Sequence, residues 1–81
     1  MDRELQQYYD NRFTLCASIG WEQLVEDLLQ SRNELAKIEN ISSQEELWKN
    51  KGKVEVLDYI LNLKEISEKV YQEILDDKTN I

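Results

Sequence analysis

The sequence predicts an all-α protein: three antiparallel helices, or four if the last one is broken, forming a hairpin or bundle with a long C-terminal helix. The chain of 81 residues has no proline and only two glycines, Gly20 and Gly52. Leu, Glu, Lys and Gln, all good helix formers, make up much of its composition. Apolar residues recur every three or four positions, which is the period of an amphipathic helix.

Two helices are predicted in the first half of the chain, over about residues 3–18 and 21–39. Leu5, Tyr9, Phe13 and Cys16 fall on one face of the first. The second has the most regular apolar stripe, formed by Trp21, Leu24, Val25, Leu28, Leu29, Leu35 and Ala36. We expect the break between them at residues 18–20, because glycine adopts the left-handed conformation that ends a helix.

A third helix is predicted over about residues 44–76. Ser43 and Glu46 have the spacing of a capping box. Two nearly opposite apolar faces follow from the 100° step per residue. The first face consists of Leu47, Val54, Leu57 and Leu61, and the second of Val56, Ile60, Leu63, Val70 and Ile74. Such a helix needs neighbours on both sides: the first two helices could cover both faces, or a second copy or a partner could cover one. A break near residues 62–64 would divide it in two.

Part of this helix is the predicted protein-interaction surface. Its residues are Trp48, Val56, Ile60, Leu63, Val70 and Ile74. Trp48 is included because it stands beside polar residues, and Trp is enriched at interface hot spots. Gly52 is predicted to be a helix-crossing point, because a glycine inside a helix costs about 1 kcal/mol relative to alanine and usually marks a close approach.

The residue types argue against catalysis. The chain has no histidine, which removes the commonest base and nitrogen ligand, and Cys16 is its only cysteine. Cys16 lies on the apolar face of the first helix, where a buried, inert thiol is expected. We therefore predict no catalytic, cofactor-binding or metal-binding residue, no small-molecule substrate, and a protein that is not an enzyme.

Charge and length restrict the partners. The net charge is −7, from 17 acidic and 10 basic residues, which disfavours direct binding to nucleic acid or anionic membrane. No apolar run approaches the roughly 18 residues that span a bilayer. The charged start after Met1 and the single thiol favour an intracellular setting. A chain this short predicts one domain over residues 1–81 with a small core, so we expect a protein partner or a homo-oligomer.

Several short patterns together resemble a group of small helical proteins encoded in the structural gene clusters of tailed bacteriophages. The patterns are Tyr8-Tyr9, Gly20-Trp21 with Leu24 and Asp27-Leu28, Glu45-Glu46-Leu47-Trp48, Lys51-Gly52-Lys53, and Leu57 with Ile60 and Leu61. The resemblance covers about residues 5–75. It implies a protein made in the bacterial host cytoplasm, as a virion component or an assembly factor, and it carries over no site residues.

Two functions follow as expectations. The first is a non-enzymatic phage structural or virion-assembly accessory protein that acts through helix-mediated protein contacts. The alternative is an acidic inhibitor of a host nucleic-acid enzyme, with carboxylates imitating phosphates. Neutral residues such as Gln23 and Gln30 interrupt the acidic face of the second helix, which weighs against the alternative.

Overall fold

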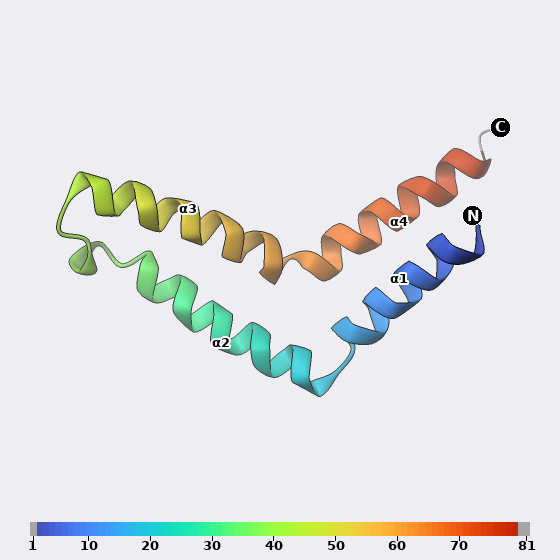
Figure 1. Cartoon of the computed structure of the whole chain (residues 1–81), viewed down its shortest axis with the longest axis horizontal. Helices are drawn as coiled ribbons and strands as arrows, with labels where there is room; N and C mark the ends of the chain where they lie inside the picture. Colours follow the sequence, from blue (N-terminus) through green and yellow to red (C-terminus); the bar gives the residue numbers. More distant parts are fainter. Residues whose placement is uncertain (1, 80–81) are drawn as a thin grey trace. The chain divides into compact units, whose positions relative to one another are not determined.

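The computed structural model describes residues 2–79, and the prediction of an all-α fold is confirmed for them. Its elements are α1 (Arg3–Cys16), α2 (Ile19–Leu35), the short 3₁₀ helix η1 (Ile38–Asn40), α3 (Gln44–Leu61) and α4 (Leu63–Thr79), which Figure 1 shows in chain order. No strand occurs in this part of the chain. The number of α-helices is four, the larger of the two that the sequence allowed.

The described residues fall into two compact units. The first contains α1, the start of α2 and α4, within residues 2–22 and 62–79, and the second consists of residues 23–61, with the rest of α2, η1 and α3. Each unit is smaller than a usual folding domain. The single domain expected over residues 1–81 therefore stays a prediction.

Aromatic rings fill the contact between α1 and α4 in the first unit. Tyr9 is only 8% exposed, and its ring centroid lies 5.3 Å from that of Tyr71. Phe13 meets Tyr71 edge to face at 5.6 Å, within the range at which aromatic pairs attract each other. Tyr9 and Phe13 of the apolar face predicted for the first helix thus pack against α4, and Cys16 at the end of this face is also buried.

Hydrogen bonds flank this aromatic contact. The guanidinium of Arg12 donates from Nη1 to the hydroxyl of Ser67 at 3.0 Å, and Tyr71 donates its hydroxyl to Oε1 of Gln6 at 3.1 Å. Ser67 is only 4% exposed, so its hydroxyl needs a partner to offset the loss of water. These bonds fix which turn of α1 lies against which turn of α4.

The second unit is held by a more polar contact between α2 and α3. Nε of Arg32 lies 2.9 Å from Oδ1 of Asp58, and this bond raises the pKa of Arg32. The side-chain amide of Asn50 donates to the carbonyl of Leu35 at 3.3 Å, at the end of α2. Asn50 is the one buried residue among residues 23–61. This pair of helices therefore buries no apolar side chain completely.

The break between α1 and α2 differs from the prediction. The helix ends at Cys16, and Gly20 lies inside the first turn of α2, with no glycine in the left-handed region among the described residues. Ser18 makes the break instead. Its hydroxyl accepts from the amide of Trp21 at 3.1 Å and donates to the carbonyl of Leu15 at 2.7 Å. A serine cap thus does what we had assigned to glycine.

α2 ends at Leu35, four residues before the predicted boundary. The side-chain amide of Asn40 donates to the carbonyl of Glu34 at 3.3 Å, and Lys37 pairs with the Glu34 carboxylate at 2.7 Å. That bond to Lys37 lowers the pKa of Glu34. Local side-chain bonds of this kind compete with helix continuation.

The predicted cap of α3 forms with one change of partner. The hydroxyl of Ser43 accepts from the amide of Glu46 at 3.1 Å, as expected. The Glu46 carboxylate does not return to Ser43: it accepts from the amide of Ser42 at 3.1 Å and from the Ser42 hydroxyl at 2.6 Å. These bonds lower the pKa of Glu46.

The long C-terminal helix of the prediction is two helices. α3 ends at Leu61 and α4 begins at Leu63, so the break lies at the start of the interval 62–64. The carbonyl of Asn62 accepts from the amide of Ile66 at 2.9 Å, and thus starts the hydrogen-bond ladder of α4. The break divides the second apolar face between two helices: Val56 and Ile60 stay on α3, and the residues from Leu63 onwards lie on α4.

Replacing Tyr9 by alanine tests the aromatic contact. We expect Tyr9→Ala to lower the free energy of unfolding by about 3 kcal/mol or more, because it leaves a cavity among packed rings. Tyr8→Ala is the matched control, since Tyr8 is 53% exposed; it should cost about 1 kcal/mol or less. Urea unfolding followed by circular dichroism measures both. Equal losses would contradict the aromatic contact between α1 and α4.

Acid sensitivity tests the cap of α3. Because the pKa of Glu46 is lowered in the folded chain, its ionised form favours folding above the ordinary glutamate pKa of about 4.3. This contribution is lost as the pH falls through the folded-state pKa. Glu46→Gln should therefore make the urea midpoint less dependent on pH below about 5, where that titration occurs. Glu45→Gln, the control, removes a carboxylate of the same helix turn that pairs with Lys49 instead of Ser42. An equally reduced pH dependence in both variants would contradict the role of the Glu46 cap.

Candidate protein-interaction surface

The six residues predicted to form an interaction surface are divided between two helices. Trp48, Val56 and Ile60 lie on α3, whereas Leu63, Val70 and Ile74 lie on α4. The two sets belong to different units. A single apolar face along one helix, as assumed from the sequence, is therefore not present, because the chain breaks at Asn62.

The two sets also differ in exposure. On α3, Trp48 is 58% exposed and Val56 60% exposed, while Ile60 is half-buried. On α4, Val70 is just exposed at 38%, and Leu63 and Ile74 are half-buried. The strongest candidate for a docking surface is consequently the exposed part of α3.

A continuous apolar stripe runs along this part of α3. Trp48, Gly52, Val56 and Tyr59 follow one another at intervals of four, four and three residues, which places them on one helix face. Tyr59 is 58% exposed. We call these four residues the α3 stripe.

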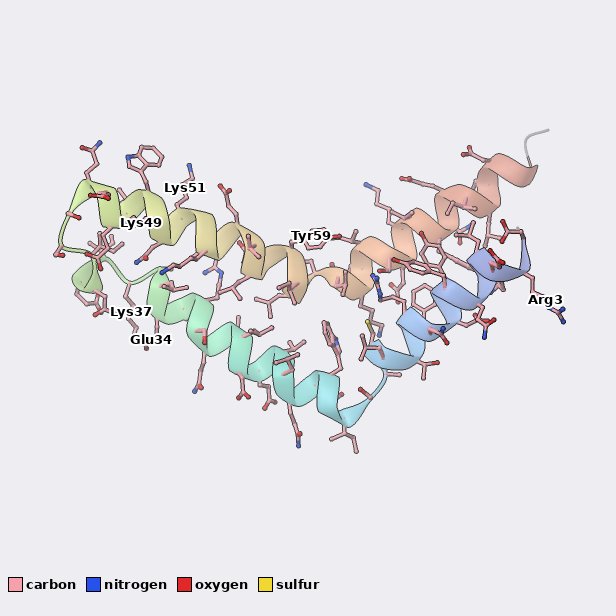
Figure 2. The ribbon with its side chains drawn as sticks, in the orientation of Figure 1. Arg3, Glu34, Lys37, Lys49, Lys51 and Tyr59 are labelled. Carbon is pink, nitrogen blue, oxygen red and sulfur yellow. The ribbon has the colours of Figure 1, made fainter. Side chains whose placement is uncertain are left out.

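The α3 stripe faces away from α2. The residues of α3 that bond to α2 are Asn50 and Asp58, and the 100° step per residue puts the middle of the α3 stripe on the other side of the helix. Figure 2 shows Lys51 and Tyr59 extending from the side of α3 opposite α2. The stripe is thus not used in holding the second unit together.

Gly52 lies at the centre of the stripe with open space in front of it. A Cβ atom built on Gly52 would have nothing within 4 Å, and the backbone is not in the left-handed region. No described residue of the chain therefore approaches Gly52 closely, and the predicted helix crossing does not occur within the part of the chain that the structure describes.

An open apolar groove begins at Gly52. It is lined by Leu35 from α2 and by Gly52, Lys53, Val56 and Leu57 from α3. A neighbouring hollow shares Leu35 and Lys53 with the groove and adds the polar residues Asp27, Gln30, Ser31 and Glu34. The exposed apolar surface of α3 is therefore edged by charged and polar side chains, as at protein interfaces with an apolar centre and a polar rim.

Charges of both signs flank the stripe. The ammonium of Lys51 lies 5.3 Å from the ring centre of Trp48, a cation–π contact. Lys49 forms an ion pair with Glu45 at 3.3 Å, one turn away along α3. These contacts hold two lysines beside the apolar residues, and Lys51 covers part of the Trp48 ring.

Tyr59 was not among the residues predicted from the sequence. Its spacing of three from Val56 was a sufficient signal. It was missed because one helix was assumed from residue 44 to residue 76. The apolar residues between 63 and 74 then determined which face was chosen, and Tyr59 lies at the edge of that face.

Other kinds of site are not evident in residues 2–79. No group of three His, Cys, Asp or Glu side chains there is arranged to hold a metal ion. None of the helices in the same residues is both long enough and apolar enough to cross a bilayer. No family of proteins, no curated protein and no solved structure matches the chain.

The different surroundings of two valines on α3 give a direct test. Val56→Thr should change the free energy of unfolding by less than about 0.5 kcal/mol, because Val56 is exposed. Val54→Thr, the matched control, places a hydroxyl at a half-buried position and should cost about 1 kcal/mol. Urea unfolding at low protein concentration measures both. A larger loss for Val56→Thr would show that the chain itself covers the α3 stripe.

Proposed function

We propose that this chain is a non-enzymatic accessory protein that acts by binding another protein chain through the α3 stripe. The observation that carries the proposal is an exposed row of large apolar side chains, with Trp48, Val56 and Tyr59 each more than half exposed. Apolar patches of this kind, edged by polar groups, are typical of protein-binding surfaces. Trp and Tyr are also the side chains that most often contribute strongly to such interfaces.

The second unit would benefit from a partner. Residues 23–61 bury no apolar side chain completely, and their contact between α2 and α3 is made partly by Arg32 with Asp58 and by Asn50. A third helix laid on the α3 stripe would enclose α3 on both sides and complete an antiparallel bundle. This is the arrangement that helices with two apolar faces generally need.

The resemblance to small phage-encoded helical proteins supplies the biological setting of the proposal. In that setting the chain is made in the bacterial host cytoplasm and contacts a virion or assembly protein. The exposed apolar row favours this function. Inhibition of a host nucleic-acid enzyme is disfavoured, because Lys49, Lys51 and Lys53 lie next to the row and interrupt the acidic side chains that would imitate phosphates.

Capture of virion proteins tests the proposal. Wild-type chain immobilised through its N-terminus should retain a capsid, portal or scaffold protein from infected cells. The double variant Trp48→Ser/Val56→Ser should retain at least tenfold less, because a Trp that acts as an interface hot spot costs about 2 kcal/mol or more when it is truncated. Quantitative mass spectrometry of the retained proteins is the measurement.

Ile38→Ser is the matched control for this experiment. Ile38 is 83% exposed and lies in η1, outside the α3 stripe. Its variant should capture as well as the wild type. If no virion protein were retained, or if retention did not depend on Trp48 and Val56, the proposed function would be wrong; retention of a basic nucleic-acid enzyme only at low salt would favour the inhibitor.

A further inference from the structure

We propose that the α3 stripe docks on an acidic amphipathic helix of the partner: the apolar row of that helix lies along the stripe, and carboxylates on both sides of the row bind Lys51 and Lys53. This inference rests on the proposed function, since it names the chemistry of the partner at the same surface. It is led by the position of these two lysines, by their lack of an ion pair within residues 2–79, and by the groove beside them.

Lys51 and Lys53 stand on opposite sides of the α3 stripe. They are the sequence neighbours of Gly52, so at 3.6 residues per turn each lies about 100° around the helix from it. A helix about 10 Å wide, laid on the stripe, would therefore have one lysine along each of its sides. Lysine side chains suit this position, because their stems follow apolar surface while the ammonium stays in water.

Neither ammonium has a carboxylate partner in the described chain. Lys51 and Lys53 take part in none of the ion pairs within residues 2–79. Lys51 lies over the ring of Trp48 instead, 5.3 Å from its centre. The pKa of Glu46 is lowered mainly by its bonds with Ser42, which engage that carboxylate, and less by the charge of Lys53. Both positive charges are thus available to carboxylates of another chain.

The charge beside the stripe is opposite to that of the whole chain. The chain carries a net charge of −7, yet residues 48–56 of α3 carry three lysines and one glutamate, a net charge of +2. Lys49 pairs with Glu45, but both side chains are exposed, so this pair contributes little and can exchange. Because Glu55 follows the lysines, the carboxylates of the partner belong at the level of Gly52. Such a partner is attracted here, whereas one with lysines beside its apolar row is repelled.

The groove beside Gly52 receives the apolar row. It is lined by Leu35 of α2 and by Gly52, Val56 and Leu57 of α3, and Lys53 is the one charged residue that the described chain contributes to it. A Cβ built on Gly52 would have nothing within 4 Å, so a large side chain of the partner has room there. Amphipathic helices bind grooves through apolar anchors of this kind, spaced three or four residues apart. The surface is small, which indicates a weak and reversible contact.

An extended polyanion fits this surface less well. DNA, RNA and anionic membranes present many phosphates, and these would also meet Glu45 and Glu55, which the 100° step places on the same side of α3 as Gly52. The net charge of −7 adds a general repulsion. A helix, in contrast, can carry carboxylates only at the level of the lysines.

Three synthetic helical peptides test the charge pattern. They share one row of leucines and carry glutamate, glutamine or lysine on both sides of the middle of that row. The full chain should bind the glutamine peptide at least threefold and the lysine peptide at least tenfold more weakly than the glutamate peptide, since an exposed ion pair contributes about two- to fivefold in affinity. The overall charge of the chain predicts the reverse order. Fluorescence anisotropy of the labelled peptides measures binding, and equal affinities or the reverse order would overturn the inference.

Reversing the charge of the two lysines tests their position. Lys51→Glu/Lys53→Glu should prefer the lysine peptide to the glutamate peptide, the opposite of the wild-type chain. Lys64→Glu/Lys69→Glu, the matched control, changes the net charge equally at exposed positions of α4 and should keep the wild-type order. Circular dichroism checks that both variants stay helical. If the control changed the order as well, total charge would select the partner and the inference would be wrong.

The other possible occupants are tested with the same variants. Vesicles of phosphatidylglycerol and phosphatidylcholine in equal parts, and a DNA duplex of random sequence, should not retain the wild-type chain. Retention by either one that is weakened in Lys51→Glu/Lys53→Glu would assign the lysines to a polyanion and overturn the inference.

Capture of virion proteins separates this inference from the proposed function. Capture that depends on Trp48 and Val56, but not on Lys51 and Lys53, leaves the proposed function standing and disproves the acidic partner helix. Selective binding of the glutamate peptide, with no virion protein retained, supports the inference and disproves the proposed function.

Discussion

The constraint on which this structure depends is that, in a unit of two helices, each helix can be covered by the other on one side only. A helix with apolar residues on more than one side cannot bury all of them against a single neighbour. In the second unit, α3 bonds to α2 through Asn50 and Asp58 and leaves Trp48, Val56 and Tyr59 more than half exposed. The exposed row is therefore a consequence of the number of helices in the unit.

The two units meet this constraint differently. The contact between α1 and α4 is aromatic, with Tyr9 buried against Tyr71, and its polar groups Arg12 and Ser67 satisfy each other. The contact between α2 and α3 instead contains an ion pair at its edge and a buried asparagine. A buried polar contact contributes less than the same area of close-packed apolar side chains, but it specifies the register of the two helices. In the second unit, polar contacts therefore fix how α2 and α3 align, and close apolar packing contributes less than it does in the first unit.

Helical class and the capping serine before α3 could be predicted from the sequence, because periodicity and short-range hydrogen bonds are local. The break after Cys16 was assigned to Gly20, since a serine that accepts one bond and donates another is harder to recognise than a glycine. The end of α2 depends on side-chain bonds from Lys37 and Asn40 to Glu34, which periodicity does not report. The interaction surface stays a prediction: Trp48 and Val56 are exposed on α3, whereas Leu63, Val70 and Ile74 belong to another helix because of the break at Asn62.

The central claim is that the outer side of α3 is a contact surface and not merely solvated helix. The most direct test is backbone amide NMR of the full chain with and without the virion protein that it captures. If the account is right, the amide signals of Trp48, Gly52 and Val56 shift or broaden when the partner is added, whereas that of Asn50, which bonds to α2, stays nearly constant. Signals that do not respond to the partner, or that respond equally on both sides of α3, would contradict it.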